Sequence, residues 1–227
     1  MEKRESLNKQ KEAKGKQDTA EIRKPSWISN KAFDIIKLIL GLCLLPFVYS
    51  STVSFLKQFG YINTTAQDYF FAGVTTFILV HFFIFEPGWI YNSGHKLLEF
   101  LFSFVQPLVK VAPYLLPVYL ITGFLLYLIL VVFIKSSWLL NYTMFLFGLS
   151  LALHLVFSSK AIRMKKGDIL KSNYIFGFSF IYITNLGILS FILNVIFYKF
   201  SFVSFCNDSY SLASGIFKVI FSQLFKV

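Results

Sequence analysis

Long apolar runs constrain this sequence more than any other feature. About five of them follow residue 34, separated by short polar connections. An α-helix rises about 1.5 Å per residue, so about 20 apolar residues cross the roughly 30 Å hydrocarbon core of a bilayer. A single run can satisfy its backbone hydrogen bonds in that core only as a helix. The sequence therefore predicts an all-α fold, a multi-pass transmembrane helical bundle.

We expect a membrane domain of residues 34–227 with about five spans, one interfacial or re-entrant helix and an amphipathic C-terminal helix. Residues 1–33 are polar and rich in both charges, so they cannot bury enough apolar surface to fold, and they are predicted to form a disordered basic cytoplasmic tail. The expected spans cover residues 35–56, 68–85, 112–134, 138–157 and 174–198. The interfacial or re-entrant helix is expected at 89–110 and the amphipathic helix at 211–227, where polar residues recur at helical spacing.

Composition excludes a soluble domain. Hydrophobic residues make up 56% of the chain, including 29 Phe, which is more than a water-facing surface tolerates. The formal net charge of +11 would suit a nucleic acid, but the basic residues lie in the N-terminal tail and in short loops. Basic residues that flank apolar spans set membrane topology instead. We predict the lipid bilayer and other membrane proteins as partners, and no nucleic acid.

The basic residues also predict the orientation of the chain. With five spans and the tail inside, the inner side receives the tail and the most basic connection, residues 158–168. This bias places the N-terminus in the cytoplasm and the C-terminus outside. A complete extra span at residues 88–110 would move that basic connection outside, so this segment is expected at the cytoplasmic face. We expect the protein in a bacterial inner (plasma) membrane.

The segment between the second and third expected spans mixes residue types as no other connection does. His95 and Glu99 are four residues apart and therefore share one helical face. In the simpler interpretation this is an interfacial helix whose polar edge faces water and headgroups. In the alternative, His95 and Glu99 ligate a metal or relay a proton. The full polar stripe comprises Asn92, His95, Lys96, Glu99, Ser103, Gln106 and Lys110.

The other two histidines fall near the same side of the membrane. Under this topology His81 and His154 lie close to the inner ends of the second and fourth spans. Ionisable side chains within spans are candidates for function, because hydrocarbon does not solvate their charge. Near an interface, however, the free-energy cost of placing a histidine in the membrane is small, and one hydrogen bond to a neighbour is enough to offset it. The leading interpretation has no cofactor, and a zinc site made by His81, His95, Glu99 and His154 is the competing hypothesis.

The motif GHKLLE at residues 94–99, followed by APYLLP at the start of the next span, resembles integral membrane metallopeptidases of the site-2-protease type. In that family a Gly-His-Glu-x-x-His helix carries two zinc-binding histidines and a glutamate that activates water, and a later helix supplies a carboxylate ligand. Gly94 and His95 match this motif. Lys96 stands at the position of the general base and Glu99 at that of the second histidine. A lysine does not replace a carboxylate that accepts a proton from zinc-bound water, so the resemblance implies a non-catalytic relative.

Three functional hypotheses follow. The first is an integral membrane protein without catalysis of its own, distantly of the site-2-protease type, acting by association with membrane proteins or lipids; it has no catalytic residue. The second is an active membrane metalloenzyme, a metallopeptidase-like hydrolase, that uses His95, Glu99 and His154. The third is a small transporter subunit in which His81 and His154 line a path.

Overall fold

The computed structural model describes residues 26–103, 106–134, 136–164 and 174–225. These residues form helices joined by short connections, with no β-strand among them, which confirms the all-α class. The helices are α2 (Ser26–Phe59), α3 (Thr64–Leu79), the π-helical turn η1 (Val80–Ile84), α4 (Gly88–Leu101), α5 (Gln106–Leu115), α6 (Val118–Phe133), α7 (Ser137–Met164), α8 (Tyr174–Ile196) and α9 (Phe202–Phe225).

Four helices are long and apolar enough to cross a membrane. Many of their large apolar side chains face outward, as lipid allows and water does not. These helices support the membrane class predicted from the sequence. They are Ile35–Phe59 within α2, Thr64–Ile84 across α3 and η1, Ser137–Arg163 within α7, and Tyr174–Ile196.

The N-terminal boundary of the helical part lies earlier than expected. Helix α2 begins at Ser26, so residues 26–33, which the sequence assigns to the tail, form its first turns. Once a helix is nucleated by the apolar span, each further residue adds a hydrogen bond at little extra cost, which favours this extension. The predicted disorder of residues 1–25 falls outside the described residues.

The third expected span, residues 112–134, is interrupted. Helix α5 ends at Leu115 and α6 begins at Val118, because Pro117 has no amide hydrogen and restricts the residue before it. Helix α6 is apolar and has 16 residues. Its length is therefore about 24 Å, shorter than the roughly 30 Å hydrocarbon core.

The expected helix 89–110 is divided into α4 and α5. Helix α4 ends in a tight turn at Phe102, whose amide bonds back to the Leu98 carbonyl at 2.9 Å. Helix α5 begins at Gln106 and has a proline in its first turn. Amide groups in the first turn of a helix make no intrahelical hydrogen bond, so a proline there costs none. Gln106 and Lys110 therefore lie in α5, Ser103 lies in the turn after α4, and the other residues of the polar stripe lie in α4.

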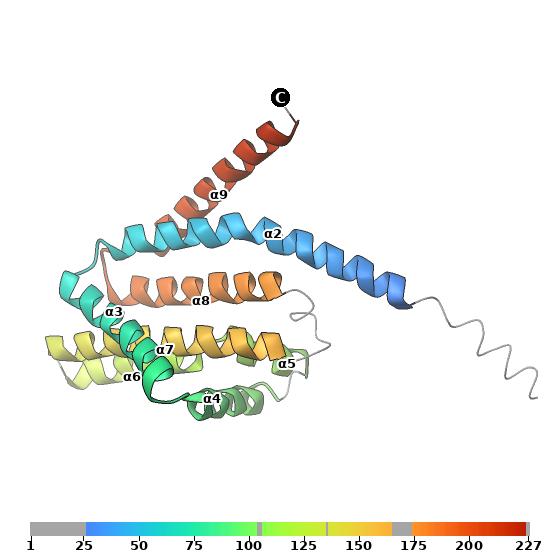
Figure 1. Ribbon diagram of the computed structural model, residues 1–227. Coiled ribbons are helices and arrows are strands. Elements are labelled where there is room, and N and C mark those ends of the chain that lie inside the picture. Colours follow the sequence, from blue (N-terminus) through green and yellow to red (C-terminus); the bar gives the residue numbers. More distant parts are fainter. Residues whose placement is uncertain (1–25, 104–105, 135, 165–173, 226–227) are drawn as a thin grey trace, which may run out of the picture.

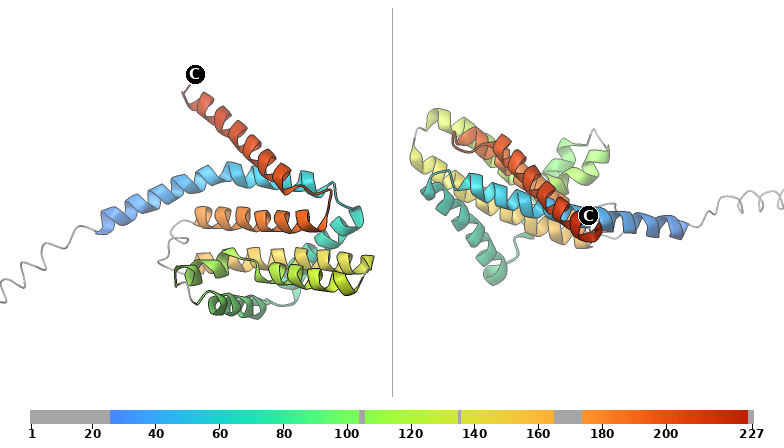
Figure 2. Two further views of the ribbon diagram at one scale, coloured as in Figure 1. Left: turned by 180° about the vertical axis from the view of Figure 1, so that it is seen from behind. Right: turned by 90° about the horizontal axis from the view of Figure 1, so that it is seen from above.

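Helices α2 and α8 lie side by side and run in the same direction. Thr52 Oγ1 of α2 is 2.9 Å from Tyr182 Oη of α8. Further along, Gln58 accepts a hydrogen bond at 3.3 Å from the Ser201 amide, just beyond α8. Figure 1 and the reverse view in Figure 2 show α2, α8, α7 and α4 stacked in this order, with α6 beside α7. The first and last expected spans thus point the same way, as alternating spans require.

Helices α3 and α7 cross at two glycines. A Cβ added at Gly73 would lie 2.9 Å from the Leu149 amide nitrogen and still closer to the Phe145 carbonyl oxygen. Reciprocally, a Cβ added at Gly148 would collide with the Phe70 carbonyl oxygen. Because neither glycine has a side chain, the two backbones touch, which is the close packing that small residues permit between membrane helices.

The C-terminal helix α9 starts before the expected range 211–227. The Ser201 hydroxyl accepts a hydrogen bond from the Ser204 amide at 3.1 Å and caps the first turn. The helix then runs antiparallel to α2 and leaves the bundle, as Figure 1 shows. Two contacts fix this direction: the 2.8 Å ion pair Lys57–Asp208 and the rings of Phe47 and Phe217, 5.9 Å apart.

Candidate functional site

Helix α4 is held against α6 and α7 by two tyrosines. The buried Tyr91 places its hydroxyl 3.2 Å from Ser158 Oγ of α7. Tyr119 of α6 donates a hydrogen bond to the Ile90 carbonyl at 2.5 Å. The Tyr119 ring also covers Gly94, where an added Cβ would lie 2.9 Å from Cε2. Gly94, which the resemblance singled out, thus has a packing role in this structure.

The structure brings His95 and His154 to the same pair of tyrosines. The His95 ring lies 5.1 Å from the Tyr114 ring and 5.9 Å from the Tyr91 ring, centroid to centroid. The His154 ring, on α7, lies 6.1 Å from the Tyr91 ring, also centroid to centroid. His95 comes from α4, His154 from α7 and Tyr114 from α5, so three helices build this cluster.

Glu99 joins the same cluster from its exposed side. Its Oε1 atom is 3.2 Å from Nδ1 of His95, in the (i, i+4) arrangement that the helical spacing predicts. The Glu99 side chain is half exposed, whereas that of His95 is mostly covered. The predicted pairing of these two residues is therefore present in the structure.

The buried His154 satisfies a backbone group that the break between α5 and α6 leaves without a helical partner. His154 Nε2 lies 3.1 Å from the Tyr114 carbonyl oxygen and 3.2 Å from Ser158 Oγ. A carbonyl only accepts, so Nε2 carries the proton in this bond and the lone pair is on Nδ1. Helix breaks are tolerated at membrane depth where neighbouring helices satisfy the freed groups.

Asn185 provides a hydrogen-bond donor to the next carbonyl in the chain, that of Leu115. Its Nδ2 donates to the Leu115 oxygen at 3.1 Å and to the Ile181 oxygen at 2.8 Å, and the residue is fully buried. We call His154 and Asn185 the break clamp, because they hold consecutive carbonyls from two helices, α7 and α8. The sequence showed Asn185 only as an amide within a span, without a partner.

His81 lies apart from the other two histidines. Its ring stacks on Phe77 with centroids 5.7 Å apart and meets the edge of Phe157 at 5.6 Å. Phe157 in turn stacks on Tyr91, so it separates His81 from the cluster. His81 Nδ1 is buried and has no hydrogen-bond partner among the described residues. The residue lies in η1, and π-helical turns are frequent at functional sites.

The four predicted metal ligands are thus only partly assembled. The structure groups His95, Glu99 and His154 around Tyr91 and Tyr114 and leaves His81 behind Phe157. Within the described ranges, no three His, Cys, Asp or Glu side chains are close enough together to hold a metal ion. The zinc site remains a prediction.

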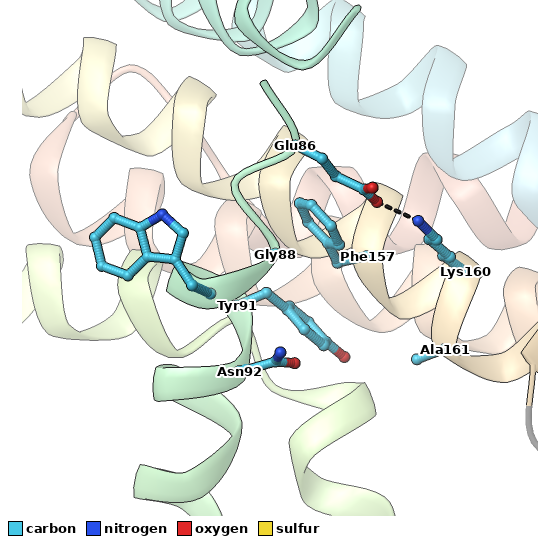
Figure 3. Close-up of a pocket in the computed structure, with 8 residues that line it drawn as sticks. Glu86, Gly88, Tyr91, Asn92, Phe157, Lys160 and Ala161 are labelled. Atoms are coloured by element: carbon cyan, nitrogen blue, oxygen red, sulfur yellow. Dashed lines mark hydrogen bonds and ion pairs between the residues drawn. The ribbon is translucent and has the colours of Figure 1, made fainter. Parts of the chain in front are cut away.

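A groove of about 430 Å³ lies next to this cluster, between the start of α4 and the last turns of α7. Glu86 and Lys160 form an ion pair on its rim, and both side chains are about half exposed. Figure 3 shows Glu86 above Phe157 and Lys160 to its right, with Tyr91 and Asn92 below. We call it the α4–α7 groove; its lining comprises Glu86, Gly88, Trp89, Tyr91, Asn92, Phe157, Lys160 and Ala161.

The surroundings of the groove shift the pKa values of Glu86 and Tyr91. The hydrogen bond from Lys160 lowers the pKa of the Glu86 carboxyl below its usual range, so this group is an anion at neutral pH. Burial raises the pKa of Tyr91 to about 12, although its hydrogen bond with Ser158 acts in the opposite sense. Tyr91 is therefore a neutral hydrogen-bonding group, and the groove presents one cation, one anion and an aromatic wall.

Sequence reasoning missed this groove. Lys160 is considered there only as part of the basic connection, residues 158–168, and Glu86 is not among the candidate site residues. Each is the first charged residue after an apolar span that, in the expected topology, runs toward the cytoplasmic side. This shared position is a sequence signal that could have predicted the pairing of Glu86 with Lys160, because spans that run in the same direction place their end residues at one depth.

A scan against protein-family models, a search of curated proteins and a search of solved structures found no match to this chain.

Proposed function

We propose that this protein is an integral membrane protein without catalysis of its own, with its N-terminus in the cytoplasm, that binds a phospholipid in the α4–α7 groove. The observation that carries the proposal is the position of the ion pair Glu86–Lys160. It lies directly after the most exposed apolar side chains of the second span, Phe82, Phe83 and Ile84, which are 74%, 80% and 72% exposed. A headgroup in the groove would leave its acyl chains beside these residues.

The residues around the groove favour binding over hydrolysis. Lys96 occupies the position at which the site-2-protease type carries its general base, and its side chain is exposed on α4. Tyr91 is neutral and cannot act as a base at physiological pH. His154 uses Nε2 to hold the Tyr114 carbonyl. If the kinship with that family is real, this arrangement fits a non-catalytic relative.

Replacing Lys160 by methionine should reduce the phospholipid that remains bound after purification. The substitution removes the cation of the groove and keeps an apolar stem of similar length. We expect about one phospholipid per unaltered chain after a mild detergent wash and a several-fold decrease in the variant, measured by extraction and mass spectrometry. Lys57→Met is the matched control, because Lys57 is also half exposed and ion-paired, at the other end of the bundle. Equal lipid content in all three proteins would contradict the proposal.

A metal centre is the second candidate, because the rings of His95 and His154 both lie against Tyr91 while Glu99 bonds to His95. Metal analysis of purified protein tests it. A lipid-binding protein should contain well below one zinc, iron or manganese per chain, whatever metal is added during growth. Stoichiometric metal that is lost in the variant His95→Ala and retained in Lys96→Ala would support the metalloenzyme and count against our proposal.

A further inference from the structure

The rim of the α4–α7 groove carries opposite charges in contact, and this restricts its ligand. Lys160 Nζ bonds to the Glu86 carboxylate, and both groups face solvent. A ligand with only a negative charge would attract Lys160 but would be repelled by Glu86 at nearly the same distance. A ligand with only a positive charge would meet the converse problem. The pair therefore suits a headgroup that carries both charges a short distance apart.

From this charge arrangement we propose that the groove selects a phospholipid with a phosphoethanolamine headgroup, whose phosphate binds Lys160 and whose primary ammonium binds Glu86. This inference rests on the proposed function, since it names the lipid class of the same site. Binding exchanges the exposed ion pair for two charge-assisted hydrogen bonds to the ligand. An exposed pair contributes little by itself, about 0 to 1 kcal/mol, so its opening is a small cost.

The primary ammonium distinguishes this headgroup from phosphocholine. An ethanolamine ammonium has three N–H donors for the Glu86 carboxylate, whereas a quaternary ammonium has none. Quaternary ammonium ions are bound by open aromatic faces. In this groove the rings of Tyr91 and Phe157 stack on one another with centroids 5.6 Å apart and planes 24° apart, so they do not form a cage. The anionic acceptor in the groove lining is the Glu86 carboxylate.

The surroundings of the groove fit a lipid at the membrane–water boundary. Exposed apolar side chains of η1 lie on one side of Glu86, and the exposed Trp89 follows it on α4. Tryptophan is enriched at this depth, because its ring is amphipathic. On the other helix the exposed Arg163 follows Lys160 by one turn and marks the polar side. The ion pair thus lies between an apolar and a polar surface, as a headgroup does.

The test is competition among lipids for the purified full-length protein, read by native mass spectrometry. Equal amounts of dioleoyl phosphatidylethanolamine, phosphatidylcholine and phosphatidylglycerol are offered in mixed micelles. We expect phosphatidylethanolamine to be retained about tenfold over phosphatidylcholine, the factor that corresponds to about 1.4 kcal/mol. The variant Glu86→Gln should lose this preference and favour phosphatidylglycerol, because Lys160 then stands as an unpaired cation.

The variant Lys160→Gln should lose headgroup selection altogether, and Lys57→Gln should behave as the unaltered protein. If phosphatidylglycerol or phosphatidylcholine binds best and binding still requires Lys160, the headgroup inference is overturned while lipid binding in the groove stands. If no lipid is retained in a manner that depends on Lys160, both fail. Thermal stability of each variant in detergent, expected to be unchanged at these exposed positions, shows that a loss of binding is not a loss of fold.

Discussion

Replacing Gly73 by alanine should lower the stability of the protein by about 3 kcal/mol, at the upper end of the range for overpacked positions. The added methyl group would lie 2.9 Å from the Leu149 nitrogen and closer to the Phe145 oxygen, both of which are backbone atoms of α7. Backbone cannot rotate away as a side chain can, so the two helices must separate. Gly148→Ala should have a similar effect, because it collides with the Phe70 carbonyl of α3.

The measurement is the fraction of protein that remains monodisperse in detergent after heating, across a temperature series. Gly187→Ala is the control, since nothing lies within 4 Å of a Cβ at that position. In a helix this control should be neutral or up to about 1 kcal/mol stabilising. The double variant Gly73→Ala/Gly148→Ala should lose less than the sum of the single losses, because one separation of the helices relieves both collisions. Equal stability of Gly73→Ala and Gly187→Ala would refute the close crossing.

Removing the break clamp is the second large expected effect. His154→Ala leaves the Tyr114 carbonyl without its partner, and Asn185→Ala does so for the Leu115 carbonyl. A buried polar group left unsatisfied costs about 1–3 kcal/mol, so we expect a loss of this size for each variant. The cause would be structural, and the loss should therefore be the same with and without a metal chelator.

Two further variants isolate the clamp from a general packing defect. Thr184→Ala removes a hydroxyl next to Asn185 that donates to the Phe180 carbonyl of its own helix, and should change stability by no more than about 0.5 kcal/mol. Pro117→Ala restores an amide and permits a continuous helix, so it should recover part of the stability lost in His154→Ala. If adding Pro117→Ala to His154→Ala lowers the stability further, the stabilising role of His154 does not depend on the break between α5 and α6.

The sequence predicted the helical membrane class because that information is local. The length of an apolar run decides whether a helix can cross a bilayer, and this length is known without knowing which helices pack against it. The same local information placed His95 and Glu99 on one helical face, where the structure has their 3.2 Å contact. Basic residues and span order also placed His154 near the segment that carries His95.

The remaining features depend on which helices become neighbours. Pro117 was visible in the sequence, but a proline in a span can bend or break it, and the outcome depends on donors from other helices such as Asn185. Glu86 and Lys160 are 74 residues apart, and their pairing follows from the packing of α3 beside α7. The expected topology puts His81 at the same depth as the other histidines, and the sequence does not indicate that the Phe157 ring lies between His81 and Tyr91.

The short helix α6 has a consequence for the surrounding bilayer. Its 16 residues extend about 24 Å, whereas the 27 residues of the apolar part of α7 extend about 40 Å. From Leu125 to its end at Phe133, the exposed side chains of α6 are all apolar. We expect hydrocarbon beside this helix to be thinner than hydrocarbon on the opposite side of the bundle, at α2, because thinning is one way in which a bilayer accommodates a short apolar helix. In a membrane the protein would then have a thin edge and a thick edge, and lipids with shorter acyl chains should gather at the thin one.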